Sequence, residues 1–180
     1  VPRDPALASD YYRQAAQKGH VSAQARWGFA LTRGLGVPEN QLEGESWLRR
    51  AALAGAAEAA AGVGGLYASG GALPPNYAEA AMWFRRAAEF GVRDSQYNLA
   101  VLLGRGLGAP TDLAQSFVWF SVAAIQGDED AGRKRDEVAQ RLKPEDLAAA
   151  KGLAASWKPK TLDAAANEVT VQNDSLGNGG

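Results

Sequence analysis

The chain has 180 residues, of which 46% are apolar and 22% charged, and its formal net charge is −1. This composition is ordinary for a soluble globular protein with a core, and the balanced charge gives no sign of a nucleic-acid surface. Because cysteine is absent, disulfides and thiolate metal sites are excluded. No apolar run approaches the ~20 residues of a membrane span. The chain starts at Val1 rather than Met, so we expect a piece of a larger or processed protein, with any membrane tether upstream.

One phrase occurs four times at a spacing of 36 residues. It is written YYRQAAQKG at Tyr11–Gly19, WLRRAALAG at Trp47–Gly55, WFRRAAEFG at Trp83–Gly91 and WFSVAAIQG at Trp119–Gly127. Such a period is typical of stacked helical units. The sequence therefore predicts an all-α solenoid over residues 5–142, with units at about 8–43, 44–79, 80–115 and 116–142.

Each unit is expected to form two antiparallel helices. In the first helix the aromatic residue and the Ala pair four positions later share one face, which predicts a buried stripe. The repeated glycine then ends the helix with a positive φ. The second helix is expected to begin near Val21, Ala57, Arg93 or Asp128. It places two residues four apart on the inward side: Trp27 and Leu31, Val63 and Tyr67, or Leu99 and Leu103.

The second unit departs from this pattern. It reads AAAGVGG at Ala59–Gly65 and SGGALPP at Ser69–Pro75. Glycine inside a helix costs roughly 0.5–1 kcal/mol relative to alanine, so we expect a loosened second helix here.

The fourth unit has lost the charges of the phrase. Ser121, Val122 and Ile125 stand where other units have mostly polar residues, and SFVWFSVAAIQG is apolar nearly all round. A helix apolar on every side is covered on every side. The expected cover is a capping helix at residues 143–157, with Pro144 in its first turn. Glu145 and Asp146 favour that helix N-terminus, and the covering side chains would be Leu147, Leu153 and Trp157.

Residues 158–180 read as a C-terminal arm. Leu162, Val169 and Val171 make its first half partly apolar, so residues 158–171 are expected to pack on the solenoid, with the concave side as one path. The Gly- and Asn-rich end is expected to be mobile.

No catalytic, cofactor or metal site is predicted. His20 is the single histidine and lies at a turn, and Asp128, Glu129 and Asp130 open a helix, where negative charge is favourable. The glycine patterns fall at unit junctions, with no strand before them, so a phosphate loop is disfavoured. Trp47, Trp83 and Trp119 are assigned to the core by their register.

Five arginines recur on the first helices and are the candidate partner-binding residues: Arg13, Arg49, Arg50, Arg85 and Arg86. A ladder of guanidinium groups could hold carboxylates of a partner protein. The alternative is pairing between units, with Glu43, Glu45, Glu79 or Glu89 as the acidic partners.

The units resemble the Sel1-like repeat family, which is related to the tetratricopeptide repeat. The residues that carry the resemblance are WFRRAAEFG at Trp83–Gly91, SQYNLA at Ser95–Ala100 and GLGAP at Gly106–Pro110. The resemblance implies a right-handed superhelical solenoid of antiparallel helix pairs and a non-enzymatic scaffold that binds another protein. Some members are reported to bind β-lactams, but their repeats are cysteine-paired and this chain has no cysteine.

A second resemblance covers Gly127 to Lys160, which is similar to the end of PodJ-type polar localisation factors of alphaproteobacteria. It implies a periplasmic domain of a membrane-anchored protein that takes part in cell polarity. A periplasmic module that binds peptidoglycan or a cell-wall enzyme is the alternative function.

Overall fold

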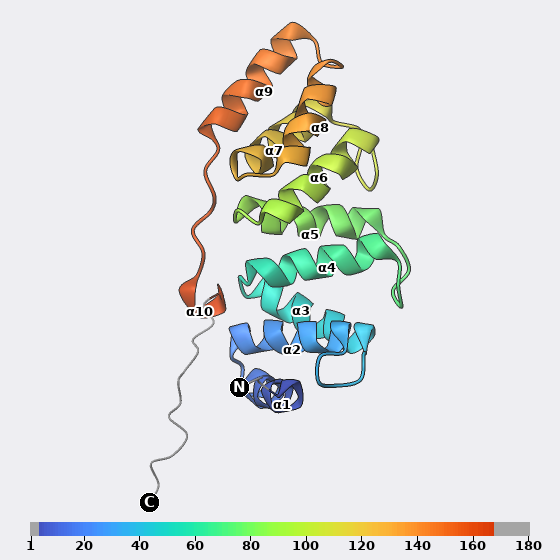
Figure 1. Cartoon of the computed structure of the whole chain (residues 1–180), viewed down its shortest axis with the longest axis vertical. Coiled ribbons are helices and arrows are strands. Elements are labelled where there is room, and N and C mark those ends of the chain that lie inside the picture. The colour runs from blue at the N-terminus through green and yellow to red at the C-terminus, as the bar shows by residue number, and fades with distance from the viewer. Residues whose placement is uncertain (1–3, 168–180) are drawn as a thin grey trace, which may run out of the picture.

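The computed structural model describes residues 4–167, and every regular element in that range is a helix. The helices stack in chain order into a solenoid, which confirms the predicted fold class (Figure 1). The helices of the stack are α1 (Pro5–Gln17), α2 (Val21–Arg33), α3 (Gln41–Leu53), α4 (Ala57–Ser69), α5 (Tyr77–Glu89), α6 (Arg93–Arg105), α7 (Leu113–Ile125) and α8 (Glu129–Ala139). They are followed by α9 (Pro144–Ser156) and a single turn, α10 (Ala164–Asn167).

The turn inside each unit is made by the repeated glycine. Gly19, Gly55, Gly91 and Gly127 have φ values of 92°, 104°, 94° and 98°, in a region that side-chain-bearing residues rarely adopt. The second helices begin where the sequence predicts, with Asp128 as the N-cap residue of α8.

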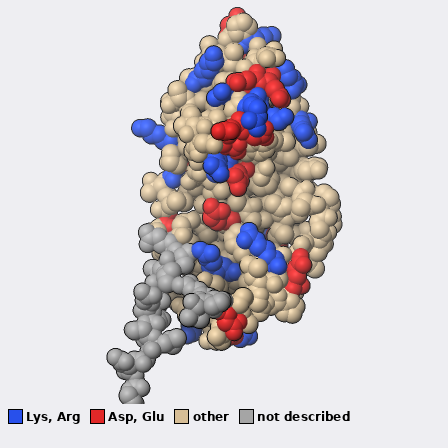
Figure 2. Space-filling view, in the orientation of Figure 1, with Lys and Arg blue, Asp and Glu red and all other residues tan. Residues whose placement is uncertain are grey.

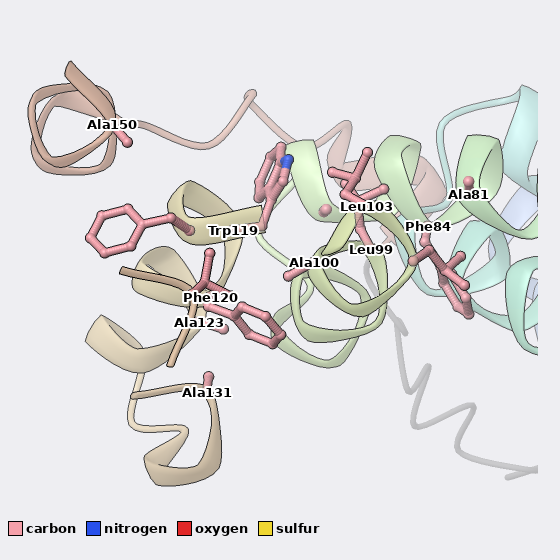
Figure 3. Close-up of a cluster of buried hydrophobic side chains, with 14 of the residues drawn as sticks. Ala81, Phe84, Leu99, Ala100, Leu103, Trp119, Phe120, Ala123, Ala131 and Ala150 are labelled. Carbon is pink, nitrogen blue, oxygen red and sulfur yellow. The ribbon is translucent and has the colours of Figure 1, made fainter. Parts of the chain in front are cut away.

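Successive units interlock through a small residue on a second helix and a large residue on the next first helix. A Cβ added at Gly28 of α2 would lie 2.8 Å from Cγ of Leu48 on α3, and one at Gly64 of α4 would lie 2.6 Å from Cδ1 of Phe84 on α5. At the next junction the equivalent residues are Ala100 and Phe120, and both belong to the buried cluster in Figure 3. This periodic fit explains why Leu48 and Phe84 are almost completely buried.

The aromatic position of the phrase differs in burial from unit to unit. Trp83 and Trp119 are buried, as predicted, whereas Trp47 is half-buried and Tyr11 is 54% exposed. The prediction of a buried aromatic is thus wrong for the first unit and only partly met at Trp47, which packs at the edge of a buried cluster. No helix precedes α1 in the described chain, and Tyr11 packs edge-on against Tyr12 instead.

The glycines of the second unit do not interrupt its second helix. Helix α4 has 13 residues, the same length as α2 and α6. Two of its glycines are sites of close approach, because a Cβ at Gly64 would overlap Phe84 and one at Gly62 would lie 2.7 Å from Cε1 of Phe29. The packing that these positions permit keeps the helix intact despite its low intrinsic propensity.

The predicted capping helix corresponds to α9, which packs against α7, a first helix. In the repeats the contact between units is different, because α3, α5 and α7 each stack on the second helix of the preceding unit. Its contacts are made by Ala150 and Ala154, both buried, and by Trp157, whose ring centroid lies 6.0 Å from that of Trp119. Leu147 is half-buried on the same stripe.

Two expectations about this cap are wrong. Leu153 is 63% exposed, because the stripe that faces α7 contains residues 147, 150, 154 and 157 and Leu153 lies beside it. Ile125 is 74% exposed, because it borders an open hollow between α7, α8 and α9 and is not covered by α9. Ser121 and Val122 are buried, as the apolar character of this helix predicts.

The arm after Trp157 packs on the solenoid, as predicted, up to the last described residue. The backbone N–H of Lys160 donates to the carbonyl of Glu89 at 2.8 Å, and Ala166 is buried. Asn167 accepts from the N–H of Ala57 at 2.9 Å and donates to the carbonyl of Gly55 at 3.0 Å. The arm therefore follows the edge formed by the turns inside the units (Figure 1), and not a concave groove. The part of the prediction at residues 168–171 lies outside the described residues.

Truncation of the chain after Trp157 should lower its thermal stability. Asn167 satisfies the N–H of Ala57 at the start of α4, and each such hydrogen bond contributes about 1 kcal/mol. Because at least two of them are lost together with the burial of Ala166, we expect Tm to fall by roughly 3–10 °C in a calorimetric scan. The variant Lys158→Ala should melt as the wild type does, and an unchanged Tm of the truncated chain would contradict the docking of the arm.

Candidate partner-binding surface

The first helices present apolar side chains to solvent, and the second helices do not. Among the described residues, every exposed large hydrophobic residue of α1–α8 lies on a first helix: Leu7, Tyr11, Leu42, Leu53, Tyr77, Met82 and Ile125. Exposed apolar side chains gathered on one set of helices are typical of an interaction surface.

The hollow between α3 and α5 brings three of the five candidate arginines together. It has a volume of about 540 Å³, and Arg49, Arg85 and Arg86 surround the exposed Leu53 and Met82. The remaining lining residues are Trp83, Glu89, Phe90 and Lys160. We refer to these nine residues as the arginine hollow.

Arg49 is the most firmly held of the three. Its guanidinium contacts Glu45 at 2.7 Å and Glu79 of α5 at 3.6 Å, and it donates to the Tyr67 hydroxyl at 3.0 Å. It also lies 5.3 Å from the Trp83 ring centroid. Burial would lower the pKa of Arg49, but the contacts with Glu45 and Tyr67 outweigh this effect and raise it above its ordinary value. Arg49 is thus a fixed cation at one side of the hollow.

Arg85 and Arg86 lack an acidic partner among the described residues. Arg85 donates to Oε1 of Gln115 at 3.1 Å across the junction to α7, and Arg86 lies 5.9 Å from the Trp83 ring centroid. Two guanidinium groups without an ion pair, beside exposed apolar side chains, can receive the carboxylates of a bound segment.

The other two candidate arginines lie elsewhere. Arg50 stacks 4.7 Å from the Trp47 ring centroid, and Arg13 pairs with Asp10 on the first helix of the chain. Of the acidic residues considered as partners, Glu45 and Glu79 do pair with Arg49, whereas Glu43 is near Asn40 and Glu89 pairs with Lys160. The partner-binding role of the five arginines stays a prediction.

Lys160 is the member of the hollow that sequence reasoning missed. Its Nζ lies 2.6 Å from Oε2 of Glu89, so the arm closes one side of the hollow. The two residues are 71 positions apart, and no local pattern signals such a contact.

The residues considered for chemistry lie at the starts of two second helices. His20 is the exposed N-cap residue of α2, and Asp128 accepts from the N–H of Ala131 at the start of α8. Asp130 accepts the hydroxyl hydrogen bond of Tyr97. Within residues 4–167 no cluster of three or more potential metal ligands occurs.

The contact of Tyr97 with Asp130 predicts a shifted phenol titration. The carboxylate of Asp130 accepts the Tyr97 hydrogen bond, and with burial it raises the pKa of Tyr97 to about 12, while the pKa of Asp130 is lowered. Because the ordinary phenol value is about 10, this tyrosine stabilises the fold fully below about pH 10, and the contribution is lost as pH rises toward 12. In Asp130→Asn the pKa of Tyr97 should fall by about one unit or more, measured as phenolate absorbance against Tyr97→Phe. Asp136→Asn should leave it unchanged, and an equal effect of both variants would contradict the assignment.

Acidic and basic side chains are interspersed over the face seen in Figure 2, with uncharged residues between them. Such a face offers no single-sign field of the kind that binds a polyanion. In the described part of the chain, no helix combines the length and the apolar character that a membrane crossing needs.

Comparison with known proteins identifies the repeat. Residues 1–20, 21–55, 57–91 and 93–128 match the model of the Sel1 repeat. The chain is similar to a protective antigen with an SLR fold from uropathogenic Escherichia coli strains, with 28% identity and a TM-score of 0.72 over 83% of this chain and 32% of that one. It is also similar to a Sel1 repeat protein from Oxalobacter formigenes, with 26% identity and a TM-score of 0.69 over 86% of this chain and 64% of that one.

The cysteine rich protein B of Helicobacter pylori shares the fold, with 20% identity and a TM-score of 0.55 over 68% of this chain and 93% of that one. No curated protein matches the sequence significantly. The chain spans less than two thirds of the length of the Escherichia coli and Oxalobacter structures. Because the repeat model matches more than half of its residues, the chain belongs to the Sel1 repeat family.

Proposed function

We propose that this chain is a non-enzymatic scaffold that binds a partner protein in the arginine hollow. Sel1 repeat proteins are generally protein-interaction scaffolds. The observation that carries the proposal is that Arg85 and Arg86 line the same hollow as the exposed side chains of Leu53 and Met82. Neither arginine has an acidic partner in the described chain. A partner segment that presents a carboxylate next to an apolar side chain matches this surface.

The finer proposal is that the partner belongs to the polar organisation of a bacterial cell and meets this domain in the periplasm. It is supported by the similarity of Gly127–Lys160 to PodJ-type factors of alphaproteobacteria, a segment that contains α8 and α9. Cell fractionation and a fluorescent fusion test it, and a cytoplasmic location would contradict it. Sedimentation with purified cell-wall sacculi would instead favour the peptidoglycan-binding alternative.

The double variant Arg85→Glu/Arg86→Glu should lose its partner in affinity capture. Each charge-assisted hydrogen bond contributes about 1.5–3 kcal/mol, so the loss of two weakens binding by roughly a hundredfold or more. Quantitative mass spectrometry of captured proteins measures the loss, and circular dichroism checks that the helices persist. Arg141→Glu, which changes an exposed arginine outside the hollow, is the matched control. Equal capture by the double variant and the control would contradict the proposal.

A further inference from the structure

A second hollow lies on the second helices, where α4 passes between α2 and α6. It has a volume of about 600 Å³, and its floor is formed by small residues of α4, with Phe29 and Arg33 of α2 on one wall. The opposite wall is formed by residues of α6: Arg93, Asp94, Ser95 and Asn98. We refer to this hollow as the α4 trough.

The floor of the α4 trough lacks side chains that the neighbouring units have. Gly65 stands where the first unit has Phe29 and the third has Val101. A Cβ added at Gly65 would meet no atom within 4 Å, so this position is open to solvent and is not filled by a neighbour. The departure that the sequence shows in the second unit therefore produces a surface depression.

One wall of the α4 trough carries a polar residue where the other units have alanine. Ser95 lines the α4 trough, is 1% exposed, and stands where the other units have Ala23, Ala59 and Ala131. Its Oγ has no hydrogen-bond partner among the described residues.

The dimensions of the α4 trough fit a helix. Its floor extends from Glu58 to Ser69, which at 1.5 Å per residue is roughly 16 Å, or three helical turns. Exposed glycine backbone allows another helix to approach closely, and Phe29 and Leu66 supply the apolar contact.

The charges at its two ends differ in sign. Arg33 lies at the end near Ser69, its guanidinium 4.5 Å from the Phe29 ring centroid, with no acidic partner in the described chain. At the other end are two carboxylates, Glu58 and Asp94, and one cation, Arg93, which lies 3.9 Å from Asp94. A helix with an acidic first turn and a basic last turn complements both ends when it runs antiparallel to α4.

We propose that the α4 trough is a second binding site, which receives an amphipathic α-helix of a partner protein antiparallel to α4. The small or apolar face of that helix lies on Gly65 and Phe29. Its acidic N-terminal turn lies at Arg33, and its basic C-terminal turn lies at Glu58. This site is separate from the arginine hollow, so one chain can hold two partner segments at once.

The test uses a fluorescein-labelled peptide of about 15 residues with an Ala/Leu face, Glu in its first turn and Lys in its last turn. Fluorescence anisotropy should show it binding the full chain at least tenfold more tightly than an isomer with the charges exchanged. Because exchanged charges also weaken the isomer's own helix, the variant Arg33→Glu/Glu58→Lys must reverse the preference.

Gly65→Gln is the variant that fills the α4 trough without disturbing the fold. A side chain at this position has open space, and the exchange of glycine in a helix should leave Tm equal or higher. It should nevertheless weaken peptide binding at least tenfold, while Arg85→Glu in the arginine hollow leaves peptide binding unchanged. Failure of this site is therefore distinguishable from failure of the proposed function.

Three results would overturn the proposal. They are equal affinity for the two peptides in all variants, undiminished binding by Gly65→Gln, and binding that appears only after residues 168–180 are removed. The last result would assign the trough to the chain's own C-terminal segment.

Discussion

Gly108→Ala is expected to destabilise the protein by about 2–4 kcal/mol, a large share of the stability of a domain of this size. Gly108 has a φ of 75°, where an L side chain costs roughly 1–2 kcal/mol. Its Cβ would also lie 2.1 Å from the carbonyl oxygen of Tyr77 and 2.5 Å from the N atom of Ala78, so the loop or the start of α5 must move. Backbone atoms cannot rotate away as a flexible side chain can, and the overlap adds to the conformational cost.

Thermal denaturation measures this effect, with an expected fall in Tm of roughly 5–15 °C. The equivalent position of the second unit is Ala72, whose φ is not positive. The loop of that unit therefore has a different backbone conformation, and its alanine does not show that alanine is tolerated at position 108. The control is Gly152→Ala in α9, where an added Cβ meets nothing within 4 Å and stability should rise by about 0.5–1 kcal/mol. A Gly108→Ala chain as stable as the wild type would contradict the close approach of the loop to α5.

Leu48→Ala is expected to cost about 2–5 kcal/mol, because Leu48 is 0% exposed and lies in the seam between the first and second units. The Leu48 side chain fits against two glycines. A Cβ added at Gly28 would lie 2.8 Å from Cγ of Leu48, and one added at Gly62 would lie 3.2 Å from its Cδ1. Truncation leaves a cavity that α2 and α4 cannot close without moving their backbones. Urea denaturation should show a lower midpoint with an unchanged slope.

A double-mutant cycle with Gly28→Ala tests the fit of this seam. Gly28→Ala alone should be destabilising, because its methyl group would overlap Leu48. In the Leu48→Ala background the same methyl group enters vacated space, so its cost should fall and the two effects should not add. Strict additivity would contradict the direct contact.

The fold could be predicted from the sequence because the residues that end, start and bury each helix recur at the same positions of the 36-residue repeat. The glycine at the end of each phrase, the start of each second helix and the burial of Val63 and Leu99 follow from register alone. Tyr11 departs from the rule because burial depends on a neighbouring helix and not on the residue's own spacing.

The interaction surface could be predicted only in part. The recurrence of arginine on the first helices identifies Arg49, Arg85 and Arg86, which do share one hollow, but it cannot separate them from Arg50, which stacks on Trp47. The orientation of α9 and the path of the arm depend on contacts between residues far apart in sequence. For the same reason Lys160 is visible in the hollow only once the chain is folded.

The arm gives this repeat protein a property that a plain stack lacks. In a solenoid each unit touches only its neighbours, so the ends can open independently of the middle. Here the segment that leaves the terminal cap is fastened to α5 by Lys160 and to the second unit by Asn167 (Figure 1). When the C-terminal cap unfolds together with the arm, the contacts of the arm with these two interior units are lost as well. The arm therefore couples the end of the stack to its middle and makes unfolding more cooperative.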